Sequence, residues 1–104
     1  MVNAKEEFLE SLIGKAVVAA HISCYNMFNS GKDDKAAYLK QGYSLVEWEY
    51  FLHQLDFTYD NGYGTQELFG IVWLEDNAWL ERAEYDGSEW WEYKQTPKIP
   101  EYLK

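Results

Sequence analysis

The sequence predicts a single α+β domain, in which an antiparallel sheet of about four strands carries two helices packed on one face. Two segments place apolar residues at helical spacing behind a capping residue. One partly β-branched run and three segments separated by tight turns read as strands. Because helices on one side leave the other side of an antiparallel sheet uncovered, we expect that side to face water.

The length and composition of the chain fit one folded core. Its 104 residues are 47% hydrophobic and 18% aromatic, which is too apolar for a disordered chain despite a net charge of −9. We therefore expect residues 1–104 to form one domain.

The first half of the chain predicts a helix, a strand and a connection. A helix is expected over 3–13, because Asn3 is a capping residue with Glu6 three places on, and Gly14 can end it. The run 15–25, "KAVVAAHISCY", predicts a buried strand that joins the later strands in one sheet. Residues 26–43 are polar and basic and predict a mobile segment with a short helical turn at "DDKAAYLK".

A second helix is expected over 45–55, behind the capping box of Ser44 and Glu47. Its predicted apolar stripe consists of Val46, Tyr50, Phe51 and Leu55.

The segment 66–95 predicts a three-stranded antiparallel meander. The turns fall at "EDN" and "DGS", between the strands "ELFGIVWL", "AWLERAEY" and "EWWEYKQ". Pro97 and Pro100 then prevent further regular pairing, so residues 96–104 are expected to form an extended tail.

The charge is distributed unevenly along the sequence. Residues 44–93 hold twelve carboxylates against one basic residue, Arg82, which gives this window a formal charge of −11, and all eight lysines lie outside it. Such a field repels nucleic acid and membrane phosphates and speeds encounter with basic surfaces. We therefore expect no direct nucleic-acid or membrane partner.

The segment "EYDGSEWWEY", residues 84–93, is the first candidate for a functional surface. Strand alternation turns one of its two adjacent tryptophans away from the core, and exposed aromatic residues are typical anchors of protein interfaces. We expect carboxylates here to contact lysine and arginine residues of a partner, with tyrosine and tryptophan packing beside them. The predicted partner-binding residues are Glu81, Glu84, Tyr85, Asp86, Glu89, Trp90 and Glu92.

Catalytic and metal-binding alternatives have weaker signals. Residues 60–67, "DNGYGTQE", suggest a calcium loop, but Gly62 and Gly64 stand where an EF-hand needs ligands. We expect a turn there, and no metal or cofactor.

Two sets of residues carry the enzyme alternatives. The pairs Glu81 with Glu84 and Glu89 with Glu92 would suit a small hydrolase only if they faced each other across a cleft with divergent pKa values. A nucleophile would have to be Cys24 or Ser23, with His21 or His53 as base, and no nucleophile elbow accompanies them. We therefore do not expect an enzyme.

Residues 61–100 resemble small acidic accessory proteins encoded in bacteriophage genomes. The elements that carry the resemblance are "GYGTQELFG", the tryptophan and arginine of "WLERAEYDGSEWW", and the closing "P-x-I-P". That class has no assigned activity, so the resemblance implies only a setting. It is one in which inhibitors of host defence, such as anti-CRISPR and anti-restriction proteins, are common.

Together these observations predict an inhibitor that occupies a basic nucleic-acid-binding site of a host defence complex and mimics nucleic acid. The first alternative is a protein interaction module, or a homodimer, without mimicry. The second is the small hydrolase. The acidic N-terminus and the absence of a long apolar run predict a cytoplasmic protein, in the host cell if it is phage-encoded.

Overall fold

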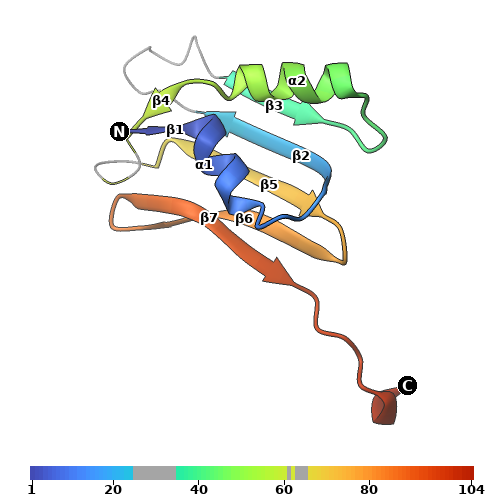
Figure 1. The fold of residues 1–104 in the computed structure, drawn as a ribbon. Helices are drawn as coiled ribbons and strands as arrows, with labels where there is room; N and C mark the ends of the chain where they lie inside the picture. The colour runs from blue at the N-terminus through green and yellow to red at the C-terminus, as the bar shows by residue number, and fades with distance from the viewer. Residues whose placement is uncertain (25–34, 61, 63–65) are drawn as a thin grey trace.

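A computed structural model describes residues 1–24, 35–60, 62 and 66–104 of the chain. The fold is α+β, as predicted, with two helices, a five-stranded antiparallel sheet and a separate two-stranded sheet. Figure 1 shows both helices on one side of the large sheet, and the chain leading away from the sheet after its last strand. Among the described residues, no helix is long and apolar enough to cross a membrane.

The large sheet has five strands, one more than predicted. Strand β2 (Val17–Cys24) lies between the edge strand β3 (Lys35–Leu39) and β5 (Leu68–Leu74), and β6 (Ala78–Tyr85) and β7 (Ser88–Gln95) complete the order β3-β2-β5-β6-β7. The extra strand is β3, which pairs with β2 in antiparallel register from Ala20↔Leu39 to Cys24↔Lys35.

Residues 35–39 were expected to belong to a mobile segment with a helical turn, and this prediction was wrong for them. Ala37 and Leu39 alternate with exposed Ala36 and Tyr38, which is the two-residue period of a strand with one buried face. Residues 26–34 of that expected segment lie outside the described residues, and residues 40–43 connect β3 to the next helix without helix or strand structure of their own.

Helix α1 (Ala4–Ser11) begins at Asn3, whose side chain accepts a hydrogen bond from the Glu6 N–H. It ends two residues earlier than expected, since Ile13 adopts a left-handed φ of 51°. Phe8 is fully buried, whereas Ile13, which was also expected to lie within the helix, is 70% exposed.

Helix α2 (Leu45–Gln54) begins at the predicted capping box, in which the Ser44 hydroxyl and the Glu47 carboxylate each accept a backbone N–H. Its buried stripe differs from the predicted one, because Val46 and Tyr50 face solvent. The residues that pack inward recur at helical spacing and are Trp48, Phe51, Leu52 and Leu55.

The core lies between the sheet and the two helices. Phe8 of α1 and Phe51 of α2 meet edge to face with ring centroids 5.6 Å apart, and both are fully buried. The two short strands β1 (Val2–Asn3) and β4 (Thr58–Tyr59) pair with each other next to α1. Beyond β7, the tail ends in a single 3-10 turn, η2 (Glu101–Leu103).

Candidate functional site

The β6–β7 hairpin carries all seven residues predicted to bind a partner. Its two-residue turn is formed by Asp86 and Gly87, with φ values of 53° and 88°, which suits the mirror-image turns that join antiparallel strands tightly. Strand alternation then divides the seven residues between the two sides of the sheet. Glu81, Tyr85, Trp90 and Glu92 lie on the side opposite the helices, Asp86 lies in the turn, and Glu84 and Glu89 lie on the helix side.

Glu89 is not a surface residue, and its prediction as a partner-binding residue was wrong. It is only 3% exposed, and its carboxylate accepts bonds from both Nε and Nη2 of Arg82, at 3.0 and 2.8 Å. The same carboxylate accepts the backbone N–H groups of Glu67 and Leu68, at 2.6 and 3.0 Å. Glu89 therefore joins β7 to β6 and to the start of β5.

Arg82 links this pair to the opposite layer of the fold. Its Nη1 donates to Glu7 of α1 at 3.0 Å, and its Nη2 also contacts the hydroxyl of Tyr59. The guanidinium lies 5.0 Å from the ring centroid of Trp91. Burial, together with the hydrogen bond that the phenol donates to Glu7, raises the pKa of Tyr59 well above its ordinary value. This cluster joins α1 and β4 to β6 and β7 and leaves Glu89 unable to reach a partner.

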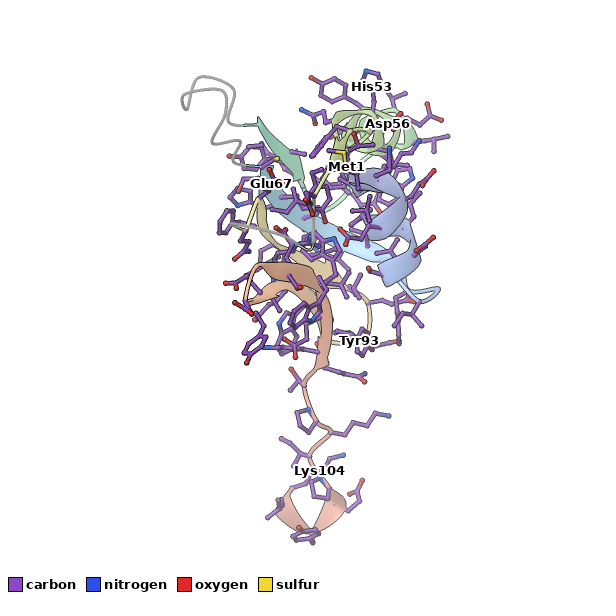
Figure 2. All side chains as sticks on the ribbon, turned by 90° about the vertical axis from the view of Figure 1, so that its left-hand side faces the viewer. Met1, His53, Asp56, Glu67, Tyr93 and Lys104 are labelled. Atoms are coloured by element: carbon purple, nitrogen blue, oxygen red, sulfur yellow. The ribbon has the colours of Figure 1, made fainter. Side chains whose placement is uncertain are left out.

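The side of the sheet opposite the helices carries several exposed aromatic side chains, and we call it the open face. No element of the described chain covers it. Figure 2 shows side chains that project from the sheet on the side away from both helices. Trp73, Trp90 and Phe69 are 46%, 42% and 43% exposed there. The open face consists of His21, Tyr38, Phe69, Ile71, Trp73, Trp79, Glu81, Tyr85, Trp90, Glu92 and Lys94.

The carboxylates of the open face differ in their partners. Glu81 accepts a hydrogen bond from the Trp79 indole at 2.9 Å and pairs with Lys94 at 3.0 Å. Both contacts, the indole bond first, lower the pKa of Glu81. Glu92 stands directly opposite Glu81 in the register and is exposed. Asp86 and Glu84 are exposed at the end of the hairpin, where Glu84 accepts the Gly87 N–H.

The two sides of β2 separate His21 from Cys24, which excludes one of the candidate base and nucleophile pairs. His21 stacks on Tyr38 with ring centroids 4.6 Å apart and shares its side of β2 with Ser23. Cys24 lies on the opposite side of the strand, so His21 cannot act as its base.

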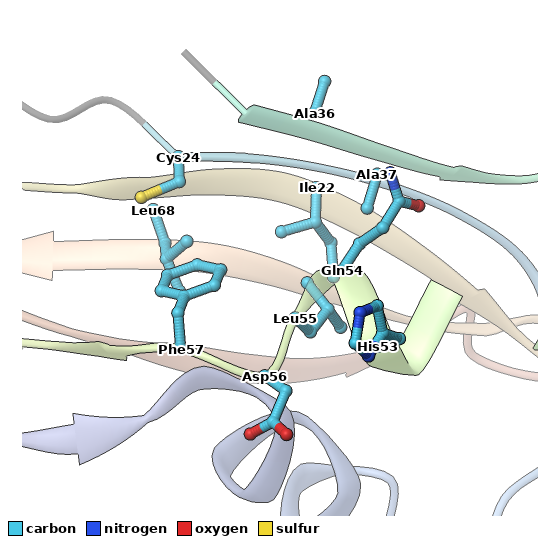
Figure 3. A pocket seen from close by; sticks show the side chains of 10 residues that line it. All are labelled: Ile22, Cys24, Ala36, Ala37, His53, Gln54, Leu55, Asp56, Phe57 and Leu68. Carbon is cyan, nitrogen blue, oxygen red and sulfur yellow. The ribbon is translucent and has the colours of Figure 1, made fainter. Parts of the chain in front are cut away.

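Cys24 lines a cavity of about 590 Å³ between the end of α2 and the helix side of β2, β3 and β5. Figure 3 shows Cys24, Leu68 and Phe57 at one end of this cavity, and His53 and Gln54 at the other. Asp56 at its rim is held by Asn3 and Lys5, which lower the pKa of its carboxyl. Apolar side chains such as Leu55 and Leu68 line this cavity together with the polar side chains of His53, Gln54 and Asp56, of which His53 and Asp56 are exposed.

The geometry of the described residues gives little support to the remaining catalytic and metal-binding candidates. In the residues that the structure describes, no three His, Cys, Asp or Glu side chains gather as a metal site would require. In the candidate calcium loop, Asp60 accepts the Gly62 N–H and Glu67 accepts the Asp60 N–H. Residues 61 and 63–65 of that loop lie outside the described residues. In the pair Glu89 with Glu92, Arg82 holds Glu89 on the helix side, while Glu92 faces the open side.

The chain matches no protein family, no curated protein and no solved structure among those with which it was compared. The resemblance of residues 61–100 to phage accessory proteins thus stays a prediction, and the function has to be inferred from the surface itself.

Proposed function

We propose that this chain is a non-enzymatic binding protein that recognises a basic protein surface with its open face. The observation that carries the proposal is the set of half-exposed aromatic side chains on a sheet face that no described element covers. Large apolar patches rimmed by polar groups mark interaction sites on proteins. Tryptophan and tyrosine are also the residues that contribute most binding energy at protein interfaces.

The charge around the open face selects the partner. Glu92, Asp86 and Glu84 are exposed near Trp90, and the window 44–93 has a formal charge of −11, from twelve carboxylates and one arginine. A negative field of this kind attracts lysine-rich and arginine-rich surfaces and repels phosphates. The partner is therefore a protein with basic residues around an apolar patch.

Affinity capture with the purified chain as bait tests the proposal, with washes at low and then high salt. We expect a partner with a basic surface that is lost from Trp90→Ala and from Glu92→Lys bait, because these changes remove an anchor and reverse a charge on the open face. Glu49→Lys is the matched control, since Glu49 is exposed on α2, away from the open face. Equal recovery of the same partners by all baits would contradict the proposal, provided that circular dichroism shows each bait folded.

A second function, nucleic-acid mimicry, is favoured by the end of the β6–β7 hairpin. There, exposed Glu84, Asp86 and Glu92 accompany an exposed Trp90, as phosphates accompany bases. In this form of the proposal the partner is a host defence complex, of the CRISPR or restriction type, whose nucleic-acid site the hairpin occupies. The resemblance of residues 61–100 to phage accessory proteins supports the same setting.

Competition distinguishes mimicry from plain protein binding. If the captured partner binds DNA or RNA, saturating nucleic acid should displace the chain, and the triple variant Glu84→Lys, Asp86→Lys, Glu92→Lys should lose orders of magnitude in affinity and most of its salt dependence. A partner that binds the chain and nucleic acid at the same time would refute mimicry while leaving protein binding intact.

A further inference from the structure

A groove of about 460 Å³ opens where β5 turns into β6, at one end of the open face. Two tryptophans and two carboxylates line it, together with one residue of β2 and one residue of the segment after β7. The side chains that matter for binding are Trp73, Trp79, Glu75 and Asp76, with Val18 and Thr96 at the edges.

The two tryptophans are held as walls of this groove. Trp73 and Trp79 stand directly opposite each other in the β5–β6 register, and Trp73 is 46% exposed. The indole N–H of Trp79 donates to Glu81 at 2.9 Å, which fixes the orientation of that ring. A preorganised aromatic wall loses little side-chain entropy when a ligand binds to it.

The two carboxylates are fixed by the turn, and each keeps one oxygen available. Asp76 and Asn77 form the turn with φ values of 62° and 58°, and Oδ2 of Asp76 pairs with Lys15 at 3.1 Å. Oε1 of Glu75 accepts the Ala16 N–H at 3.2 Å. Within the described part of the chain, Oδ1 of Asp76 and Oε2 of Glu75 receive no hydrogen bond or ion pair.

We propose that this groove binds an arginine side chain of the partner polypeptide, with the guanidinium against the indoles of Trp73 and Trp79 and its N–H groups bonded to Asp76 and Glu75. This inference rests on the proposed function, because it names the basic group that the open face recognises. Indole faces attract cations, and guanidinium is a plane that stacks on them while it bonds to carboxylates. The local carboxylates repel phosphate ligands, and a purely apolar ligand would offer no donor to Oδ1 of Asp76 or Oε2 of Glu75.

The test uses two short peptides that differ in one residue, arginine or the neutral isostere citrulline. The chain has five tryptophans, so its indole N–H signals in a nitrogen-proton NMR spectrum can be assigned with Trp73→Phe and Trp79→Phe. We expect the arginine peptide to shift the Trp73 and Trp79 signals until they saturate. The citrulline peptide should bind at least about tenfold more weakly. Asp76→Asn should weaken the arginine peptide by a similar factor, and asparagine tolerates the positive φ at this turn position.

Tyr50→Ala is the matched control and should bind the arginine peptide as the parent chain does, because Tyr50 is an exposed aromatic residue of α2 that lies neither on the open face nor in the groove. Equal binding of both peptides, or no shift of Trp73 and Trp79 at millimolar arginine peptide, would overturn the groove as an arginine site. If shifts then occur at Trp90 instead, or if the captured partner still depends on Trp90 and Glu92, the proposed function stands and only the groove fails. If the partner also binds the Trp90 and Glu92 variants normally, the proposed function fails as well.

Discussion

Nη2 of Arg82 lies 2.8 Å from Oε1 of Glu89, and both side chains are almost completely withdrawn from solvent, at 1% and 0% exposure. The chain has a single arginine and places it inside the fold. On the helix side of the sheet, the buried ion pair of Arg82 and Glu89 therefore joins the two strands of the acidic hairpin. The opposite side of the hairpin is part of the open face.

Removing one partner of this pair should destabilise the fold strongly. We expect Glu89→Ala to lower the free energy of unfolding by about 3–5 kcal/mol, because Nε of Arg82 and the backbone N–H groups of Glu67 and Leu68 lose their acceptor, although Arg82 keeps its ion pair with Glu7. Chemical denaturation measures the change. The control Glu84→Ala alters the exposed residue opposite Glu89 in the register and should cost roughly 0.5 kcal/mol or less. Similar costs for the two variants would show that the buried pair contributes little.

The raised pKa of Tyr59 leads us to expect that the free energy of unfolding falls at alkaline pH. Its pKa is raised in the folded chain, so its contribution to stability is complete below the unfolded tyrosine pKa of about 10 and is lost as the pH rises above that value. The unfolding free energy should then fall by up to about 1.4 kcal/mol per pH unit from this group alone. Tyr59→Phe should start less stable and lose stability less steeply above pH ~10 than the parent chain. Parallel pH profiles for the two proteins would argue against a buried, neutral phenol.

Gly70 is required by the close approach of β2. A Cβ at this position would lie 2.3 Å from the backbone oxygen of His21 and 3.0 Å from Cα of Ile22. Gly70→Ala should therefore cost at least about 2 kcal/mol, since backbone atoms of the central strands would have to shift. Gly62→Ala is the matched control, because a Cβ there meets nothing within 4 Å, and it should be neutral to slightly stabilising. Thermal unfolding of both variants decides the matter, and an unchanged Tm for Gly70→Ala would contradict so close an approach of the two strands.

The purified chain should be monomeric at low salt despite its exposed aromatic residues. Two open faces brought together would bring carboxylates such as Glu81 and Glu92 of one copy close to those of the other, in a protein of net charge −9. Sedimentation velocity at several protein concentrations gives the answer. A dimer that persists at both low and high salt would support the homodimer alternative in place of a separate basic partner.

Local signals in the sequence located the helix starts and the turns. The capping box of Ser44 and Glu47, the cap at Asn3 and the turn of Asp86 and Gly87 depend on neighbouring residues alone, so they could be read without knowing the fold. Alternation also required that one of Trp90 and Trp91 be exposed, and Trp90 is that residue.

The non-local pairing could not be read in the same way. Glu89 resembles its exposed acidic neighbours in sequence, and its role depends on Arg82 across the hairpin and on the start of β5. One signal was present, because alternation places Arg82 with Leu80 and Glu89 with Trp91 on the buried side. Strand β3 was missed because its short alternation, from Ala36 to Leu39, follows a polar segment that reads as a loop. The groove between Trp73 and Trp79 depends on strand register and carries no local motif.

The most direct test of the central claim is photo-crosslinking inside bacterial cells, with a benzophenone amino acid placed either at Trp90 or at Tyr50. Both positions hold exposed aromatic residues, one on the open face and one on α2, at 42% and 64% exposure. The account predicts a defined protein adduct from position 90, on a partner surface rich in lysine and arginine, and none of that identity from position 50. An adduct from position 50 without one from position 90 would show that the chain binds its partner through α2 and would contradict the role of the open face.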